Sequence, residues 1–218
     1  MIQHLIWDVD GTLFDTYPAL TRSFSMALRE LGVTLPLDSD WITGLARQSL
    51  GQCVTTLAGK FNLSLEEVQD RFWQNYRSIS PQDQPPFAGV MEVCETIRST
   101  GGTNVIASHR GKASILGLLK AHGMTQYFQD YLAGDDPFPK KPDPAVFVEM
   151  IRRHQFKREE TLAIGDRDID ILAGQAAGVR TCLFGSASSE VSPDCSITDY
   201  ADLQRLILAE NSRQQPRQ

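Results

Sequence analysis

Apolar residues follow two different patterns along the chain. Residues 3–9 form a short apolar run that predicts a buried strand. From residue 16 to residue 79 the spacing is helical, and no convincing strand interrupts it. The spacing predicts three helices, whose apolar positions are Leu20, Phe24, Ala27, Leu28 and Leu31, then Leu50, Val54, Leu57, Ala58 and Phe61, then Leu65, Val68, Phe72 and Tyr76.

Local signals mark the limits of this helical block. Ser64 with Glu67 three residues later is a capping-box pattern, which predicts the start of the third helix. The proline-rich segment 80–86 reads as a linker, because proline cannot continue a helix and favours turns. The block is therefore expected to be a separate, all-helical insertion.

After residue 87 the pattern alternates between helices and strands. Strands are predicted at 103–108, 131–133, 161–165 and 180–184, and helices at 89–99, 111–122, 144–153, 169–177 and 201–209. This alternation predicts an α/β fold with a Rossmann-like parallel sheet and helices on both faces. We expect a discontinuous core domain (1–15 and 83–218), a helical cap domain (16–82) and a disordered polar tail, residues 211–218.

Composition narrows the class of protein. Apolar residues make up 41% and charged residues 22%, which is typical of a soluble globular protein. The net charge of −6 argues against nucleic-acid binding through phosphate contacts. No apolar run reaches the length of a membrane span, and the N-terminus lacks a signal-peptide pattern. The cysteines show no metal-binding or redox spacing and are expected to be reduced thiols in the cytoplasm: Cys53, Cys94, Cys182 and Cys195.

Two aspartates follow the first predicted strand. Asp8 and Asp10 are two residues apart, so the strand period places both side chains on one face, at the end of a parallel strand where ligands gather. Gly11 permits close approach of a backbone or a phosphate. Calcium-binding loops share the string Asp-x-Asp-Gly, but here the downstream glutamate is missing and a buried strand precedes it. Two adjacent carboxylates need a cation or a proton between them.

Four segments in order resemble the motifs of the haloacid dehalogenase superfamily, in its phosphatase branch. They are Asp8-Val9-Asp10-Gly11-Thr12-Leu13-Phe14-Asp15, Ile106-Ala107-Ser108, Lys140-Lys141-Pro142-Asp143-Pro144 and Ile164-Gly165-Asp166-Arg167-Asp168-Ile169-Asp170. Each falls at the edge of a predicted strand or helix, and the resemblance covers nearly the whole chain. It implies the superfamily's α/β core with an inserted helical cap.

The resemblance also implies site residues and a cofactor. Asp8 would attack phosphorus and become an aspartyl phosphate, and Asp10 would protonate the leaving group and then activate water. Mg²⁺ would be held by Asp8, by Asp166 and by the backbone carbonyl of Asp10. Asp170 would act on the ion through water or by orienting the lysine.

Further residues are candidates for the site. Ser108 would donate a hydrogen bond to a phosphoryl oxygen, and Lys141 would offset the negative charges, with its neighbour Lys140 facing solvent. Asp168 is expected to have a structural role at a helix start. His109 departs from the small or amide residue common at its position, so a substrate contact and an ordinary loop position stay open. Arg47 would bind an anionic substrate group from a polar loop of the cap, or remain a solvated arginine.

The resemblance leaves more than one activity open. The leading hypothesis is a Mg²⁺-dependent phosphatase similar to phosphoglycolate phosphatases, acting on a small phosphorylated metabolite. The alternative is a phosphomutase of the β-phosphoglucomutase type. A dehalogenase is disfavoured because it needs neither Asp10 nor an acidic metal cluster, and a non-catalytic module because every matched position is chemically competent. A monomer is the default expectation, with a dimer left open.

Overall fold

The computed structural model describes residues 1–185 and 191–212. The chain divides into two compact units. One, here called the core unit, comprises residues 1–14 and 86–218, and the other, the helical unit, comprises residues 15–85.

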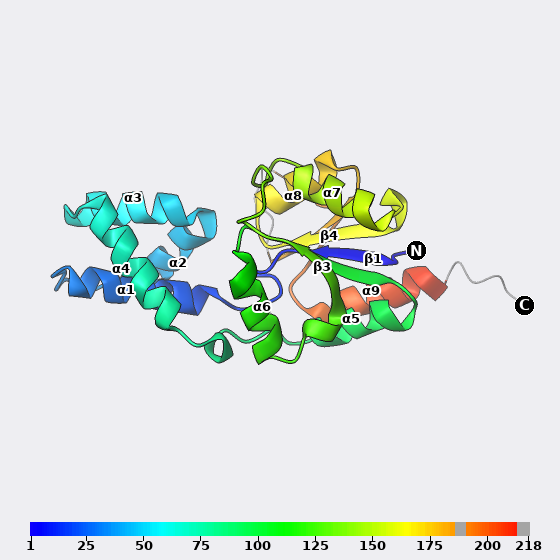
Figure 1. Ribbon diagram of the computed structural model, residues 1–218, viewed down its shortest axis with the longest axis horizontal. Coiled ribbons are helices and arrows are strands. Elements are labelled where there is room, and N and C mark those ends of the chain that lie inside the picture. Colours follow the sequence, from blue (N-terminus) through cyan, green and yellow to red (C-terminus); the bar gives the residue numbers. More distant parts are fainter. Residues whose placement is uncertain (186–190, 213–218) are drawn as a thin grey trace, which may run out of the picture. The chain divides into compact units, whose positions relative to one another are not determined.

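A parallel six-stranded sheet forms the centre of the core unit (Figure 1). Its strands are β1 (His4–Trp7), β2 (Thr103–Ala107), β3 (Phe128–Leu132), β4 (Thr161–Gly165), β5 (Arg180–Phe184) and β6 (Cys195–Ile197). The strand order is β3-β2-β1-β4-β5-β6, and every neighbouring pair is parallel. The α/β fold with a parallel sheet predicted from the alternating pattern is therefore confirmed.

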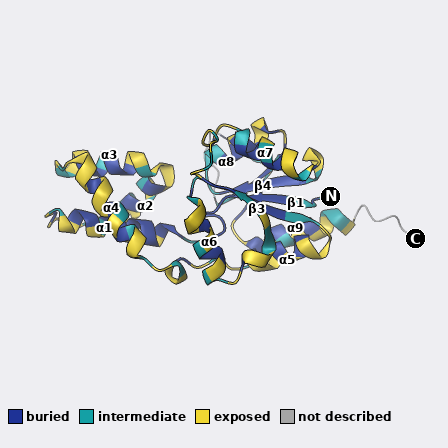
Figure 2. Ribbon diagram, in the orientation of Figure 1, coloured by how far each residue is buried: buried dark blue, intermediate teal, exposed yellow. Residues whose placement is uncertain are grey.

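Helices cover both faces of this sheet. They are α5 (Val90–Ser99), α6 (Lys112–Ala121), α7 (Ala145–His154), α8 (Asp168–Ala176) and α9 (Tyr200–Ser212), with short 3₁₀ turns at Thr125–Tyr127 and Arg158–Glu160. Alternate residues of β1 face opposite layers: Leu5 and Trp7 join the apolar cluster of α5, α6 and α9, whereas Ile6 joins that of α7 and α8. Figure 2 shows the buried sheet between helices whose outer faces are exposed.

The helical unit contains α1 (Tyr17–Glu30), α2 (Ser39–Gln48), α3 (Leu50–Phe61) and α4 (Leu65–Ser78), followed by a 3₁₀ turn at Pro81–Asp83. It has its own apolar core, in which the rings of Phe24 and Phe72 stack with centroids 4.0 Å apart. Ser64 caps α4 by accepting a hydrogen bond from the backbone N–H of Glu67, as the capping-box pattern predicts.

The structure departs from the sequence predictions at several places. Helix α2 was not predicted, because it buries only Ile42 and Ala46 and so shows weak apolar spacing. Strand β3 begins earlier than the predicted 131–133, because the polar residues Gln129 and Asp130 interrupt the apolar run there. The three-residue strand β6 is too short to give a pattern.

The predicted disorder of residues 211–218 is wrong for the first two of them. Helix α9 continues to Ser212. Asn211 fixes its end by accepting a hydrogen bond from the Ile2 backbone N–H at 2.9 Å and donating one to the Ile2 carbonyl at 3.0 Å. Residues 213–218 lie outside the described part of the chain.

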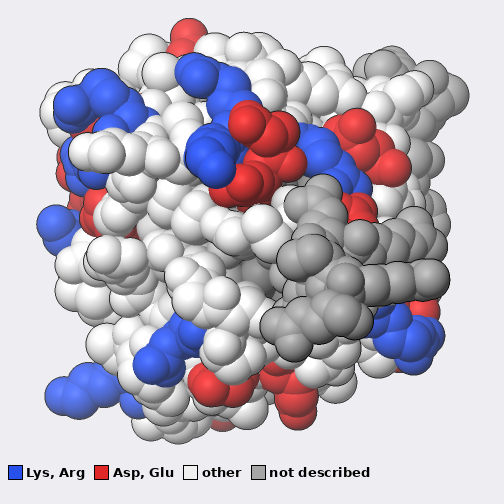
Figure 3. Space-filling model, turned by 90° about the vertical axis from the view of Figure 1, so that its right-hand side faces the viewer, with Lys and Arg blue, Asp and Glu red and all other residues white. Residues whose placement is uncertain are grey.

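Charged side chains of both signs are interspersed on the face of the molecule drawn in Figure 3. Within residues 1–185 and 191–212, no helix combines the length and apolar character needed to cross a membrane.

Candidate active site

The ends of three neighbouring strands bring the predicted acidic site together. Because β2, β1 and β4 are adjacent and parallel, the residues that follow them meet at one edge of the sheet. Asp8 follows β1 and is buried, Ser108 follows β2, and Asp166 follows β4. The backbone N–H of Asp8 donates to the carbonyl of Ile164 at 2.9 Å, which ties the end of β1 to β4.

A tight turn, rather than the strand period, places Asp10. The strand β1 ends at Trp7, so both aspartates lie beyond it and the predicted strand to residue 9 is too long. Gly11 has a φ of 76°, a conformation that side chains disfavour, and its N–H donates to the Phe14 carbonyl at 2.9 Å. The turn is held further by Tyr200, whose hydroxyl donates to the Thr12 carbonyl at 2.8 Å.

Lys141 is the buried counter-charge of the site. Its Nζ lies 2.6 Å from Asp8 Oδ1, 2.5 Å from Asp170 Oδ1 and 3.0 Å from the Ala107 carbonyl oxygen. Burial alone would lower the pKa of Lys141, but the carboxylates of Asp170 and Asp8 raise it. Burial likewise opposes the ionisation of Asp8, but the charges of Lys141 and Arg167 outweigh it and lower the pKa of Asp8. Both groups are therefore held in their charged forms.

Three carboxylates form a cluster that could hold a cation. One oxygen each of Asp8, Asp166 and Asp170 lie within 4.8 Å of one another. Asp8 Oδ2 is buried and has no hydrogen-bond partner among the described residues. A buried carboxylate oxygen without a donor is costly, and an all-oxygen donor set is the one that hard divalent cations prefer. The residues present therefore fit a divalent cation.

Asp170 is held in place by its neighbours as well as by Lys141. Its Oδ2 accepts from the backbone N–H of Arg167 at 3.2 Å, at the start of α8. A Cβ on Gly165 would lie 2.2 Å from the Cβ of Asp170, so β4 can approach the helix this closely only with glycine there. Asp168 lies in the first turn of α8, in keeping with the structural role expected of it.

Ser108 is buried at the end of β2. Its Oγ accepts a hydrogen bond from the backbone N–H of Arg110 at 3.2 Å, so its own proton is available to donate to an anion. His109 is half-buried, and its Nε2 is buried without a hydrogen-bond partner in the described chain. Burial, and then the charges of Lys141 and Arg167, lower the pKa of His109 to about 4, so the ring is neutral near neutral pH. Lys140 is exposed, as expected.

Arg110 was not among the predicted site residues, yet it contacts Asp10. Its Nη2 lies 2.8 Å from Asp10 Oδ1, and the side chain of Arg110 is 6% exposed. The carboxylate of Asp10 therefore lies against Arg110 and outside the three-carboxylate cluster. A cation two residues beyond Ser108 was the sequence signal for this pair, but only the fold shows which carboxylate it meets.

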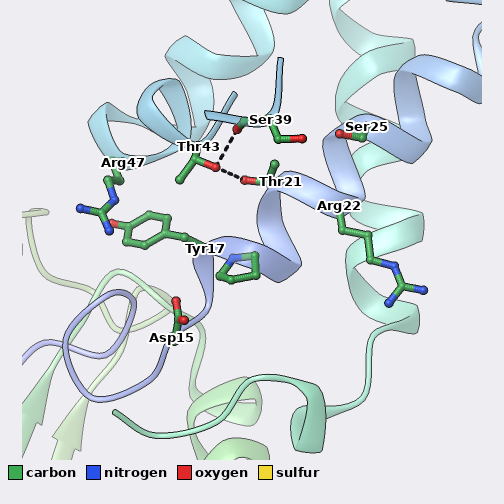
Figure 4. Close-up of a pocket in the computed structure, with 9 residues that line it drawn as sticks. Asp15, Tyr17, Thr21, Arg22, Ser25, Ser39, Thr43 and Arg47 are labelled. Carbon is green, nitrogen blue, oxygen red and sulfur yellow. Dashed lines mark hydrogen bonds between the residues drawn. The ribbon is translucent and has the colours of Figure 1, made fainter. Parts of the chain in front are cut away.

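Arg47 belongs to the helical unit. It lies near the C-terminal end of helix α2, so the predicted polar loop is wrong at this position. Its guanidinium stacks 4.6 Å from the centroid of the Tyr17 ring (Figure 4). Both residues line a pocket of about 590 Å³ together with Asp15, Pro18, Thr21, Arg22, Ser25, Ser39 and Thr43.

This pocket combines cationic and hydroxyl groups. Thr43 donates to the Ser39 carbonyl at 2.8 Å, and its Oγ1 lies 2.7 Å from that of Thr21 (Figure 4). Burial raises the pKa of Asp15, and the charge of Arg47 opposes that rise. The guanidinium groups of Arg22 and Arg47 give this pocket the means to bind an anionic group.

Comparison with known proteins shows the family to which this chain belongs. Residues 5–184 match the haloacid dehalogenase-like hydrolases. The chain is a member of this family. It is 30% identical to a phosphoglycolate phosphatase of Photobacterium profundum, covering 93% of this chain and 94% of that protein. It is 28% identical to another phosphoglycolate phosphatase, from Yersinia pestis, covering 93% and 91% of the two chains.

Solved structures agree with this assignment at the level of the fold. A predicted phosphoglycolate phosphatase from Haemophilus somnus superposes with a TM-score of 0.83 at 19% identity, covering 94% of this chain and 98% of that one. A putative β-phosphoglucomutase from Thermotoga maritima superposes with a TM-score of 0.79 at 18% identity, covering 95% and 99%. As a haloacid dehalogenase-like hydrolase with phosphatase relatives, the protein is a phosphoric monoester hydrolase.

Proposed function

We propose that this phosphatase hydrolyses a small phosphorylated metabolite of the phosphoglycolate type through an aspartyl phosphate on Asp8. The observation that carries the proposal is the state of the Asp8 carboxylate. Lys141 fixes Oδ1 at 2.6 Å, while Oδ2 is buried without a partner among the described residues. A buried, ionised carboxylate of this kind can act as a nucleophile or as a metal ligand, because one of its oxygens is not held by the protein.

The first half of the proposed reaction transfers the phosphoryl group to the enzyme. A carboxylate oxygen of Asp8 attacks phosphorus, and the bond between phosphorus and the leaving oxygen breaks. That oxygen takes a proton from the carboxyl group of Asp10. Ser108 donates a hydrogen bond to a phosphoryl oxygen, and the positive charge of Lys141 offsets the negative charge that develops on the phosphoryl group.

The second half releases phosphate. A water molecule attacks the phosphorus of the aspartyl phosphate and gives a proton to Asp10, which restores the starting enzyme. In the proposal, Asp8, Asp166 and the backbone carbonyl of Asp10 hold Mg²⁺, and Asp170 supports the site through Lys141. When bound, the ion neutralises charge on the phosphoryl oxygens. The buried, unpartnered Asp8 Oδ2 and the nearby Asp166 support this cofactor.

The substrate class rests on the curated relatives and on the pocket of the helical unit. Phosphoglycolate carries a carboxylate, and a guanidinium such as that of Arg47 can bind a carboxylate through two hydrogen bonds. His109 would contact the substrate as a neutral ring. We also propose that the protein is a monomer and that it works in the cytoplasm. The cytoplasmic location is supported by the reduced state of Cys53, Cys94, Cys182 and Cys195, which form no disulfide.

One experiment tests the activity and its alternative. Purified protein with Mg²⁺ is given phosphoglycolate, β-glucose 1-phosphate or para-nitrophenyl phosphate, and both inorganic phosphate and glucose 6-phosphate are measured. The proposal expects phosphate release, fastest from phosphoglycolate. Formation of glucose 6-phosphate in place of free phosphate would identify a phosphomutase instead.

A further inference from the structure

The Asp10 carboxylate is bound unequally at its two oxygens. Arg110 donates to Oδ1 twice, from Nε at 3.1 Å and from Nη2 at 2.8 Å. Oδ2 receives one longer contact, from Nε at 3.3 Å. The Asp10 side chain remains 27% exposed, whereas that of Arg110 is 6% exposed. Arg110 thus anchors Oδ1, and it binds Oδ2 more weakly.

Arg110 is itself fixed by its surroundings. Its Nη1 donates to Ser114 Oγ at 2.6 Å, and Ser114 belongs to α6. Its carbonyl accepts from the backbone N–H of Gly134 at 2.9 Å. A Cβ on Gly134 would lie 2.0 Å from the carbonyl oxygen of His109, so this loop packs directly against the backbone beyond β3. A side chain held at both ends can impose an orientation on the group it binds.

The same residue also contacts Ser108. The Arg110 backbone N–H donates to Ser108 Oγ at 3.2 Å, while its guanidinium holds Asp10. Arg110 therefore couples the expected phosphoryl-binding hydroxyl to the expected proton-transfer group. A shift of the backbone at Arg110 would therefore move Ser108 and Asp10 together.

We infer that Arg110 is a positioning residue, which anchors Asp10 by Oδ1 and directs Oδ2 to the leaving oxygen. This inference rests on the proposed function. In the step, the proton on Oδ2 passes to the leaving oxygen as its bond to phosphorus breaks, and Oδ2 later takes a proton from the attacking water. Arg110 keeps all its protons, and Oδ1 accepts its hydrogen bonds before and after the transfer.

The test is the dependence of kcat/KM on the leaving group. Aryl and alkyl phosphates whose leaving groups span a wide range of pKa are compared in wild type, Arg110→Met, Asp10→Asn and the double variant. Misplacing the general acid Asp10 slows the reaction most for poor leaving groups, because these depend most on receiving a proton as they depart. Arg110→Met should therefore lower kcat/KM for alkyl phosphates by about 10- to 100-fold, and para-nitrophenyl phosphate much less.

The double variant separates positioning from a general structural effect. If Arg110 acts through Asp10, Arg110→Met should cost little more in the Asp10→Asn background. Arg110→Lys keeps a cation but loses the two-nitrogen contact, so it should recover part of the alkyl phosphate activity. Equal losses across all leaving groups, or fully additive losses in the double variant, would overturn the inference.

Controls address folding and the proposed function. Arg205 forms an exposed ion pair with Asp202 on α9, so Arg205→Met removes an arginine from another arginine–aspartate pair and should leave the rates unchanged. Thermal unfolding of each variant reports whether it is folded. Wild type inactive on every ester would contradict the proposed function. An active wild type, with the same leaving-group dependence in Arg110→Met, would contradict the role of Arg110 alone.

Discussion

Lys141 Nζ lies 2.6 Å from Asp8 Oδ1, and the Lys141 side chain is fully buried. The same nitrogen lies 2.5 Å from Asp170, so a single cation serves two buried carboxylates. Removing one partner of a buried ion pair is costly, because the remaining charges lose their compensation. Lys141 therefore connects the stability of the core unit to the chemistry of its site.

Replacing Lys141 should therefore reduce both the stability and the activity of the protein. We expect Lys141→Met to abolish phosphatase activity and to lower the free energy of unfolding by about 3–5 kcal/mol, measured by urea denaturation. Adding Asp170→Asn should restore part of the stability without restoring activity. Lys157→Met is the matched control, because Lys157 is 66% exposed in its pair with Glu160. Unchanged stability in Lys141→Met would contradict the buried-pair account.

The nucleophile is tested by Asp8→Asn. An amide cannot accept the phosphoryl group, so steady-state turnover should be lost. Wild type should form a phosphoprotein that is stable in acid and cleaved by hydroxylamine, and the variant should form none. Substantial activity in a clean preparation of the variant would exclude Asp8 as the nucleophile.

The metal prediction concerns Asp166, the half-buried member of the cluster. Asp166→Ala should weaken Mg²⁺ binding and activity together, with binding followed by titration calorimetry in the absence of substrate. Calcium should inhibit, because it prefers more ligands and a looser geometry. Full activity in chelator-treated protein would contradict a metal requirement.

Arg47 tests the selection of substrate. Loss of one charge-assisted contact should cost about 1.5–3 kcal/mol in transition-state binding, so Arg47→Ala should lower kcat/KM for phosphoglycolate. Hydrolysis of para-nitrophenyl phosphate, which has no carboxylate, should be largely retained. Arg22→Ala, in the same pocket, shows whether the effect is specific to Arg47. Equal losses on both substrates would assign Arg47 a structural role.

His109 should contribute to the pH dependence of stability. Its pKa falls from 6.5 to about 4 in the folded protein, so between these values the unfolded chain binds the proton more readily. Its contribution is present above pH 6.5 and is lost as the pH falls towards about 4. In urea denaturation at several pH values across this range, His109→Gln should lose less stability on acidification than wild type, with His122→Gln as the control. Parallel pH profiles for His109→Gln and wild type would rule out this contribution.

Most helices and strands were predictable from the sequence. The alternating pattern after residue 87 indicated a parallel sheet, because a helix between two strands returns the chain to the same end of the sheet and so makes the strands parallel. Asp8, Ser108 and Asp166 were expected in one site because the segments that carry them resemble the motifs of the haloacid dehalogenase superfamily, and in the structure each follows a strand of the parallel sheet. Helix α2 and strand β6 escaped prediction because burial of very few residues leaves no periodic signal.

The sequence by itself determined the α/β core, the helical insertion and the residue types of the acidic site, because periodicity and motif order are properties of neighbouring positions. Tertiary structure alone showed that Arg110 meets Asp10, and it gave the contacts of Lys141, whose place in the site the resemblance had implied. Arg110 and Asp10 are 100 residues apart, and Lys141 and Asp8 are 133 apart. Such pairings depend on how strands are ordered in the sheet and how loops pack beyond them. A buried charge is stabilised by whichever group the fold brings within hydrogen-bond distance, however far away that group lies in the chain.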